Sequence, residues 1–218
     1  MRAALPAVLL AGTMLAGCAN TESSTRAAPS AGTPAAATAA ALEQRLADLE
    51  ARAQRIEDIN AIKRLQRAYG YYLDEGRWDD AADLFADDAS VEIGFDGVYK
   101  GRARIREYFR ALGNGTQGLK PGQLNEQLQL MPVITMLPGG QQAKGTWRAV
   151  ILSGQLGRDA FWSEGPYENL YVKQDGVWKI AGLHWFQTLW VPYEGGWQKH
   201  GDVNAGRFVG DRLKPDAP

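Results

Sequence analysis

The chain has 218 residues, and its 24 Lys and Arg residues nearly balance its 25 Asp and Glu residues, leaving a formal net charge of −1. This balance excludes general nucleic-acid binding, because a surface that binds nucleic acid must neutralise many phosphates. The single Cys and two His residues exclude a disulfide framework and a zinc cluster of Cys and His. We therefore expect no metal site and no cofactor.

The N-terminus has the pattern of an export signal. Arg2 precedes an apolar run over residues 3–16, which is too short to span a membrane as a helix but long enough for the core of a signal peptide. The run ends at Leu15-Ala16-Gly17-Cys18 and resembles a bacterial lipoprotein signal. The resemblance implies that residues 1–17 are removed and that palmitate or a similar acyl chain on Cys18 attaches the protein to a membrane.

The residue after Cys18 is Ala19 rather than Asp. In lipoproteins of Gram-negative bacteria this resemblance favours the outer membrane, with the folded part in the periplasm. The alternative is an ordinary secretory signal in which Cys18 has no role. Residues 18–40 are rich in Ala, Thr, Ser, Pro and Gly, which predicts a flexible tether.

A helical pattern follows the tether over residues 41–55. Its apolar side chains recur at spacings of four and three, at Leu42, Leu46, Leu49, Ala53 and Ile56. The pattern covers only two heptads, which is marginal for a coiled coil that forms alone. It predicts either an oligomerising stem, in a homodimer or homotrimer, or an amphipathic helix that lies on its own domain.

Residues 56–197 have the length of one domain with its own core, and residues 198–218 are expected to be a C-terminal tail. The domain begins with helices, of which Gly76 ends the first, and a further helix is expected over residues 103–112. Four strands are then expected, over residues 124–137, 143–156, 167–173 and 177–191. A loop is expected over residues 157–166. Helices followed by long antiparallel strands predict an α+β fold.

Four short segments carry a family resemblance within this order of elements. They read YYLDEGRWD from Tyr71, LFADDA from Leu84, GVYKG from Gly97 and DGVWKI from Asp175. Over residues 56–192 the chain resembles the SnoaL-like branch of the nuclear transport factor 2-like superfamily. The resemblance implies a cone-shaped fold, with N-terminal helices packed on a curved antiparallel sheet, here with an N-terminal helical extension. Proteins of this fold include dehydratases, isomerases, cyclases and non-catalytic binders.

The resemblance also implies one acid–base residue. In dehydratases of this fold an Asp near the end of the first helix projects into the cone, and Asp74 occupies that position here. A carboxylate among aromatic side chains is desolvated, which raises its pKa towards neutrality. Tyr72, on the same helix, would be its partner. The alternative is a structural Asp74 that binds a backbone N–H or pairs with Arg77 or Arg148.

His184 is the second candidate catalytic residue. Dehydratases of the scytalone type carry two His residues on neighbouring strands, and the corresponding segments here, 125–128 and 148–153, contain none. The resemblance therefore does not extend to that reaction. Strict alternation along the last strand places His184 on the same face as Trp178 and Ile180. A lone His on such a face is either a base or a buried core residue.

Four further side chains are predicted to line or orient the ligand: Trp78, Trp147, Tyr167 and Asn169. The loop expected over residues 157–166 carries Phe161 and Trp162, which predicts a lid or a subunit contact. The low net charge favours a small, uncharged apolar or aromatic molecule as the ligand. Two functions remain open. One is a lipid-anchored lyase or isomerase with cofactor-free acid–base chemistry, and the other is a non-catalytic binding or assembly module.

Overall fold

The computed structural model describes residues 34–194 and 216–217, with side chains from residue 38. The predicted signal peptide, Cys18 and most of the predicted tether and tail lie outside the described residues. Contacts divide the chain into two units, residues 1–44 and residues 45–218, and the second unit contains the folded domain. Within the described part of the chain, no helix has both the length and the apolar character that a membrane span requires.

Helix α1 (Pro34–Asp74) is continuous and begins inside the predicted tether. In the second unit its last turns enter the core, where Ile62, Tyr69 and Leu73 are buried. The helix ends at Asp74, and Gly76 follows in the turn that terminates it, as the sequence predicts, with a backbone φ of +67° that favours glycine. A Cβ at this position would also lie only 2.6 Å from the backbone of Gly118.

Two shorter helices follow, α2 (Trp78–Asp83) and α3 (Arg102–Leu112). Neither Asp79 nor Asp80 caps α2, because its N-cap residue is Arg77 and no side-chain cap is formed. Instead, Asp79 accepts hydrogen bonds from Arg110 at 2.7 and 2.8 Å. These bonds join α2 to α3, whose buried side chains Ile105, Tyr108 and Phe109 form an apolar stripe.

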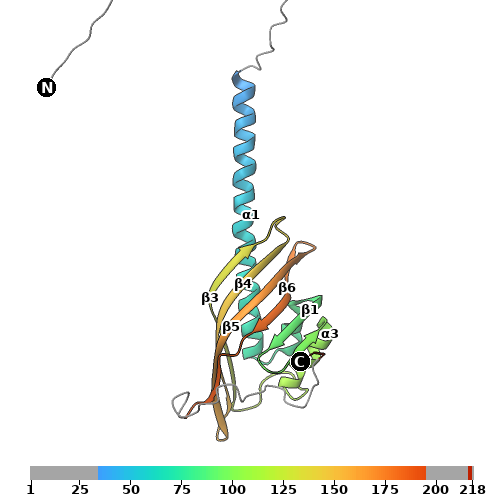
Figure 1. Ribbon diagram of the computed structural model, residues 1–218, viewed down its shortest axis with the longest axis vertical. Coiled ribbons are helices and arrows are strands. Elements are labelled where there is room, and N and C mark those ends of the chain that lie inside the picture. The colour runs from blue at the N-terminus through green and yellow to red at the C-terminus, as the bar shows by residue number, and fades with distance from the viewer. Residues whose placement is uncertain (1–33, 195–215, 218) are drawn as a thin grey trace, which may run out of the picture. The chain divides into compact units, whose positions relative to one another are not determined.

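The helices pack against a seven-stranded sheet (Figure 1). The strand order is β2-β1-β6-β5-β4-β3, and β7 pairs with β5. The strands are β1 (Phe85–Ile93), β2 (Val98–Lys100), β3 (Gln123–Met136), β4 (Gln142–Gln155), β5 (Asp159–Gln174), β6 (Val177–Trp185) and β7 (Leu189–Pro192). All pairs are antiparallel except β1 with β6, which is parallel. The predicted α+β fold, with helices packed on a curved sheet, is confirmed.

Strand β5 contradicts the loop expected over residues 157–166. Its pairing with β4 runs without interruption from Asp159 opposite Gln155 to Val172 opposite Gln142. Phe161 and Trp162 are therefore strand residues and not part of a lid loop. The last expected strand is instead interrupted, because β6 ends at Trp185 and β7 begins at Leu189.

A β-bulge in β6 reverses the faces expected for its last residues. Leu170 of β5 pairs with Gly182 but Tyr171 pairs with Ile180, so Ala181 is an extra residue in β6. The extra residue turns Leu183 and Trp185 inward, where both are buried. The prediction that His184 shares a face with Ile180 is therefore wrong, since the bulge turns it to the outer face.

Large aromatic side chains form much of the core. Trp78, Trp147 and Trp185 are among its largest fully buried side chains. Around them, the ring of Tyr69 lies 6.1 Å from the rings of Phe85 and Phe109, between centroids. Burying one large apolar side chain contributes about 1.5–3 kcal/mol, so these aromatic contacts dominate the packing between the helices and the sheet.

Candidate ligand-binding cavity

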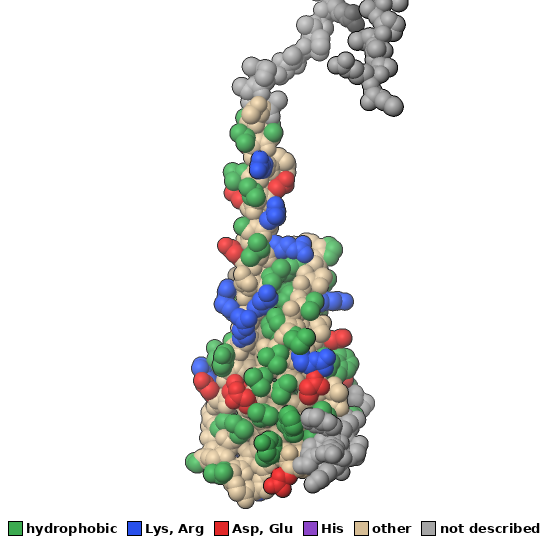
Figure 2. Space-filling model, turned by 90° about the vertical axis from the view of Figure 1, so that its left-hand side faces the viewer, with side chains coloured by type: hydrophobic (Ala, Val, Ile, Leu, Met, Phe, Trp, Pro, Cys, Tyr) green, Lys and Arg blue, Asp and Glu red, His purple; other side chains and the backbone are tan. Residues whose placement is uncertain are grey.

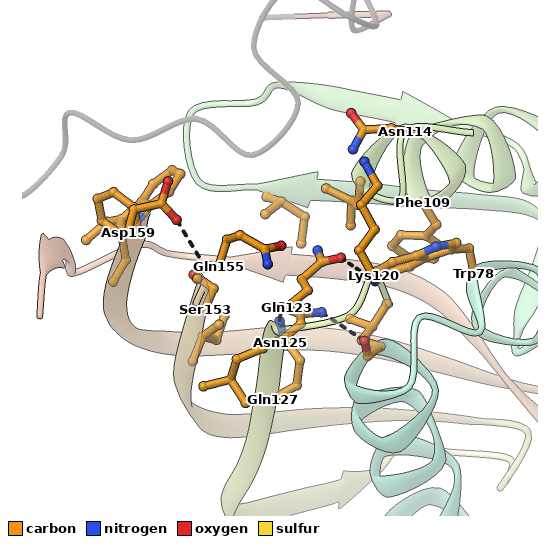
Figure 3. A pocket seen from close by; sticks show the side chains of 18 of the residues that line it. Trp78, Phe109, Asn114, Lys120, Gln123, Asn125, Gln127, Ser153, Gln155 and Asp159 are labelled. Atoms are coloured by element: carbon orange, nitrogen blue, oxygen red, sulfur yellow. Dashed lines mark hydrogen bonds between the residues drawn. The ribbon is translucent and has the colours of Figure 1, made fainter. Parts of the chain in front are cut away.

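A cavity of about 300 Å³ lies between the helices and the inner face of the sheet. Aromatic and aliphatic side chains line its interior: Tyr69, Leu73, Trp78, Phe109, Ile151, Tyr167 and Trp185. Polar side chains surround its other end: Asn114, Lys120, Gln123, Asn125, Gln127, Ser153, Gln155, Arg158 and Asp159 (Figure 3). The cavity therefore has an apolar interior and a polar mouth.

The polar mouth arises from the alternation of side chains along β3. Gln123, Asn125 and Gln127 are two residues apart, so all three lie on the same face of the strand. Gln127 Nε2 donates to Asn125 Oδ1 at 3.1 Å, and Asn125 Nδ2 donates to the carbonyl of Leu73 at 2.8 Å. These bonds orient the amides and hold the end of α1 against β3.

The neighbouring strand β4 continues the same wall in the same way, through Ile151, Ser153 and Gln155, which pair with Gln127, Asn125 and Gln123. Gln155 Nε2 donates to the carbonyl of Pro121 at 3.0 Å, which ties the end of β4 to the segment before β3. Sequence reasoning did not select Gln127, Ser153 or their neighbours as site residues. The signal that could have revealed them is a polar residue at every second position of these strands, next to buried Ile151.

The interior of the cavity is electrically neutral at ordinary pH. Burial raises the pKa of Tyr167 to about 12 and raises the pKa of Tyr69 and Tyr108 well above 10. These hydroxyl groups therefore stay protonated and can donate hydrogen bonds. At the mouth, Arg158 Nε lies 2.7 Å from Asp159 Oδ2, so these two charges compensate each other.

Asp74 is half-buried at the end of α1, and it is not among the residues that line the cavity. Its Oδ1 accepts the backbone N–H of Gln127 at 2.5 Å. Burial raises the pKa of Asp74 to about 6, against the opposing effect of this hydrogen bond. Neither predicted arginine partner is used, since Arg77 pairs with Asp80 and Arg148 pairs with Glu164.

The other two predicted catalytic residues also lie away from the cavity lining. Tyr72 is covered by the guanidinium group of Arg77, 4.4 Å from its ring centroid. His184 lies on the outer face of the sheet, stacked on Phe186, with Nε2 3.4 Å from Glu92 Oε1. The structure thus does not bring Asp74, Tyr72 and His184 together around one substrate.

The four predicted ligand-contacting residues divide into two pairs. Trp78 and Tyr167 line the cavity. Trp147 and Asn169 instead belong to a buried hydrogen-bond network. In this network the Tyr171 hydroxyl accepts from Trp147 Nε1 at 2.9 Å and from Asn169 Nδ2 at 3.1 Å, and donates to Gln66 Oε1 at 2.8 Å.

Within residues 34–194 and 216–217, no group of three His, Cys, Asp or Glu side chains is placed to hold a metal ion.

A family model for the SnoaL-like domain matches residues 54–184, which is more than half of the chain. The chain belongs to the SnoaL-like domain family. A comparison with curated proteins gave no match.

Solved structures share the fold of this SnoaL-like chain. A candidate scytalone dehydratase from Novosphingobium aromaticivorans is 21% identical, with a TM-score of 0.55 over 63% of this chain and 89% of its own. The hexachlorocyclohexane dehydrochlorinase LinA-type3 from Novosphingobium barchaimii is 20% identical, with a TM-score of 0.55 over 68% and 95%. ActVI-ORFA from Streptomyces coelicolor is 11% identical, with a TM-score of 0.50 over 60% and 96%.

Proposed function

We propose that the protein binds one small apolar or aromatic molecule in the cavity and holds it without converting it. The observation that carries this proposal is the division of the cavity wall into an apolar interior and a polar mouth that contains several amide side chains. Such a wall removes an apolar body from water, while amide groups orient one polar end. The volume of about 300 Å³ is at the lower end of small-molecule sites, so the ligand is small.

The position of the acid–base candidates supports binding over catalysis. General acid–base chemistry needs a group within hydrogen-bond reach of the reacting atom. Asp74, Tyr72 and His184 are absent from the cavity lining in the described part of the chain. The interior hydroxyl groups of Tyr69 and Tyr167 hold their protons too firmly to act as bases near neutral pH.

A binding titration tests this function. An uncharged aromatic compound such as 2-naphthol is added to the full chain, and Trp fluorescence is recorded, because Trp78, Trp185 and Trp190 line the cavity. We expect saturable quenching at one molecule per chain. Ser153→Phe should abolish it by filling the cavity. Thr146→Phe, at an exposed position of the same strand, is the matched control and should bind normally.

Acid–base catalysis is the second candidate function, and the raised pKa of Asp74, about 6, favours it. In the structure, Asp74 Oδ1 is held by the backbone N–H of Gln127, and Asp74 is outside the cavity lining. Asp74→Asn keeps an oxygen acceptor for the Gln127 N–H. If the protein only binds its ligand, Asp74→Asn retains full affinity, and neither the variant nor the native protein converts the ligand to a product. Conversion of the ligand by the native protein but not by Asp74→Asn would establish catalysis.

The proposal also includes attachment to the outer membrane through acyl chains on Cys18, with the domain in the periplasm. The apolar run before Leu15-Ala16-Gly17-Cys18 supports it. Replacing Cys18 with Ser should move the protein from the membrane fraction to the soluble periplasmic fraction of a Gram-negative host. Unchanged retention in the membrane fraction would contradict lipid anchoring.

A further inference from the structure

The domain does not cover an apolar stripe on α1. Leu46, Leu49 and Ile56 are 58%, 51% and 61% exposed, and Ala53 between them is also exposed. Asp58, only two residues after Ile56, is 6% exposed. Because a helix turns about 100° per residue, these two residues lie on nearly opposite sides. The stripe therefore faces away from the domain that covers Asp58.

Charged side chains flank this stripe in a regular order. If Leu46 and Ala53 are the a positions of a heptad and Leu49 and Ile56 the d positions, Arg45 and Arg52 occupy g positions. Glu50 and Glu57 then occupy e positions. All four side chains are exposed, and none forms an ion pair with another described residue. Figure 2 shows hydrophobic, basic and acidic side chains interspersed on the exposed part of the helix.

We infer that the stripe is the interface with a second copy of the chain, in a parallel and in-register coiled coil. In this arrangement Arg45 of one copy lies beside Glu50 of the other, and Arg52 lies beside Glu57. The two copies make these contacts reciprocally. An antiparallel arrangement would place g positions beside g positions, and thus Arg beside Arg and Glu beside Glu. The order of charges therefore selects both the partner and its direction.

The same charges argue against a membrane surface as the occupant of the stripe. Helices that lie on anionic membranes carry an excess of Lys and Arg on their polar face. Residues 45–57 instead contain three Arg residues and three acidic residues, so their charges sum to zero. The family match begins at residue 54. The stripe therefore belongs mainly to the extension of this chain and not to the shared domain.

Disulfide trapping tests the direction of the pair. In a full chain with Cys18→Ser, which leaves no other thiol, Leu46→Cys and Ile56→Cys are each oxidised alone and then as a mixture. A parallel pair gives disulfide dimers with each variant alone. The exposed Ala51→Cys, on the other side of the helix, is the matched control and should remain monomeric. Dimers that form only in the mixture, equal linking of the control, or no linking at all would overturn the inference.

Charge reversal tests the partner independently of the trapped bond. Arg45→Glu with Arg52→Glu places only acidic residues beside the stripe, and sedimentation in mild detergent should show loss of the wild-type oligomer. Adding Glu50→Arg and Glu57→Arg to the same chain restores opposite charges across the interface and should restore the oligomer. Unchanged association of the first variant, or no recovery in the second, would overturn the inference.

Discussion

Opposing effects set the pKa of the Asp74 carboxyl group. Removal from water raises the pKa, and the nearby carboxylates of Glu126 and Glu75 raise it further. The backbone N–H of Gln127 lowers it, because a hydrogen-bond donor favours the ionised form. The net result, about 6, means that Asp74 changes charge near neutral pH without being in the cavity lining.

This pKa predicts a dependence of stability on pH. The folded pKa of about 6 lies above the ordinary value of 3.8, so folding is favoured while Asp74 is protonated. The contribution is complete below pH 4 and is lost as the pH rises through about 6. After allowance for solvent screening, its size is about 1–2 kcal/mol. Chemical denaturation at pH 5 and pH 7.5 measures this change.

The matched variants isolate the effect of Asp74. Asp74→Asn cannot ionise and should lose this part of the pH dependence, so that it is more stable than the native protein at pH 7.5. Asp88→Asn, the same change at an exposed Asp that is not among the groups shifting the pKa of Asp74, should retain the native dependence. Equal pH dependence in Asp74→Asn and the native protein would show that Asp74 titrates in its ordinary range.

The buried hydroxyl group of Tyr171 joins α1 to the sheet through hydrogen bonds. The Tyr171 hydroxyl joins Trp147 of β4 to Gln66 of α1, and Asn169 Nδ2 donates to the same Gln66 Oε1 at 2.9 Å. Gln66 continues the network by donating to Gln129 of β3 at 2.9 Å. Asn169 and Trp147 therefore position α1 on the sheet and do not contact the cavity.

Removal of this hydroxyl should be costly. Tyr171→Phe leaves Trp147 Nε1 buried without its acceptor, and an unsatisfied buried polar group costs about 1–3 kcal/mol. We expect the free energy of unfolding to fall by this amount in urea denaturation. Tyr71→Phe, at a position that is 66% exposed on the same helix as Gln66, is the control and should change nothing. Equal stability of the two variants would contradict the network.

At the scale of elements, the path of the chain after β6 depends on a missing side chain in β5. A Cβ at Gly165 would lie 1.9 Å from the carbonyl oxygen of Phe186. This close approach lets the segment between β6 and β7 continue along the same edge of β5, where Phe186 N donates to the Pro166 carbonyl at 2.9 Å and Thr188 N donates to the Glu164 carbonyl at 2.8 Å. Gly165 thus allows β7 to pair with β5.

Substitution of this glycine should therefore displace β7. Gly165→Ala is expected to lower the free energy of unfolding by about 1–3 kcal/mol, the usual cost of overpacking a close contact. Gly182→Ala in β6 is the matched control, because its Cβ would meet its nearest neighbour at 3.6 Å. Thermal unfolding followed by circular dichroism compares them. A similar melting temperature for both variants would show that the segment between β6 and β7 can move without cost.

Local patterns predicted the elements better than they predicted the faces of the strands. The turn at Gly76 after α1 and the position of α3 follow from glycine and from helical spacing, which are properties of neighbouring residues. The position of His184 depends on Ala181, an extra residue that only pairing with β5 reveals. Strict alternation cannot detect such a bulge, so the inner and outer faces of β6 were exchanged after it.

The sequence predicted only part of the candidate site, because the direction of a side chain also depends on residues that are distant in the sequence. Trp78 and Tyr167 were recognised as large aromatic residues near the expected pocket, and both line it. Asp74 was placed by resemblance to dehydratases, but its carboxyl group binds the backbone of β3. The direction of a side chain at the last turn of a helix depends on the strand that packs against it, and the sequence of the helix does not contain that information.

At the scale of the whole molecule, the domain and its extension have separate tasks in the proposed function. The SnoaL-like domain supplies the cavity, and the stem before it supplies the contact with a second copy. The acyl chains on Cys18 would attach both to a membrane. Each task rests on different residues, so the Ser153→Phe, Arg45→Glu with Arg52→Glu, and Cys18→Ser variants should each affect one task and leave the others intact.

Native mass spectrometry of the protein purified from its own source tests the central claim most directly. The full chain and its Ser153→Phe variant are compared under conditions that preserve non-covalent complexes. We predict that the native chain carries one small apolar or aromatic molecule and that the variant, with its cavity filled, carries none. A native chain without any bound molecule, or the same molecule bound equally to both proteins, would contradict a ligand-binding role for this cavity.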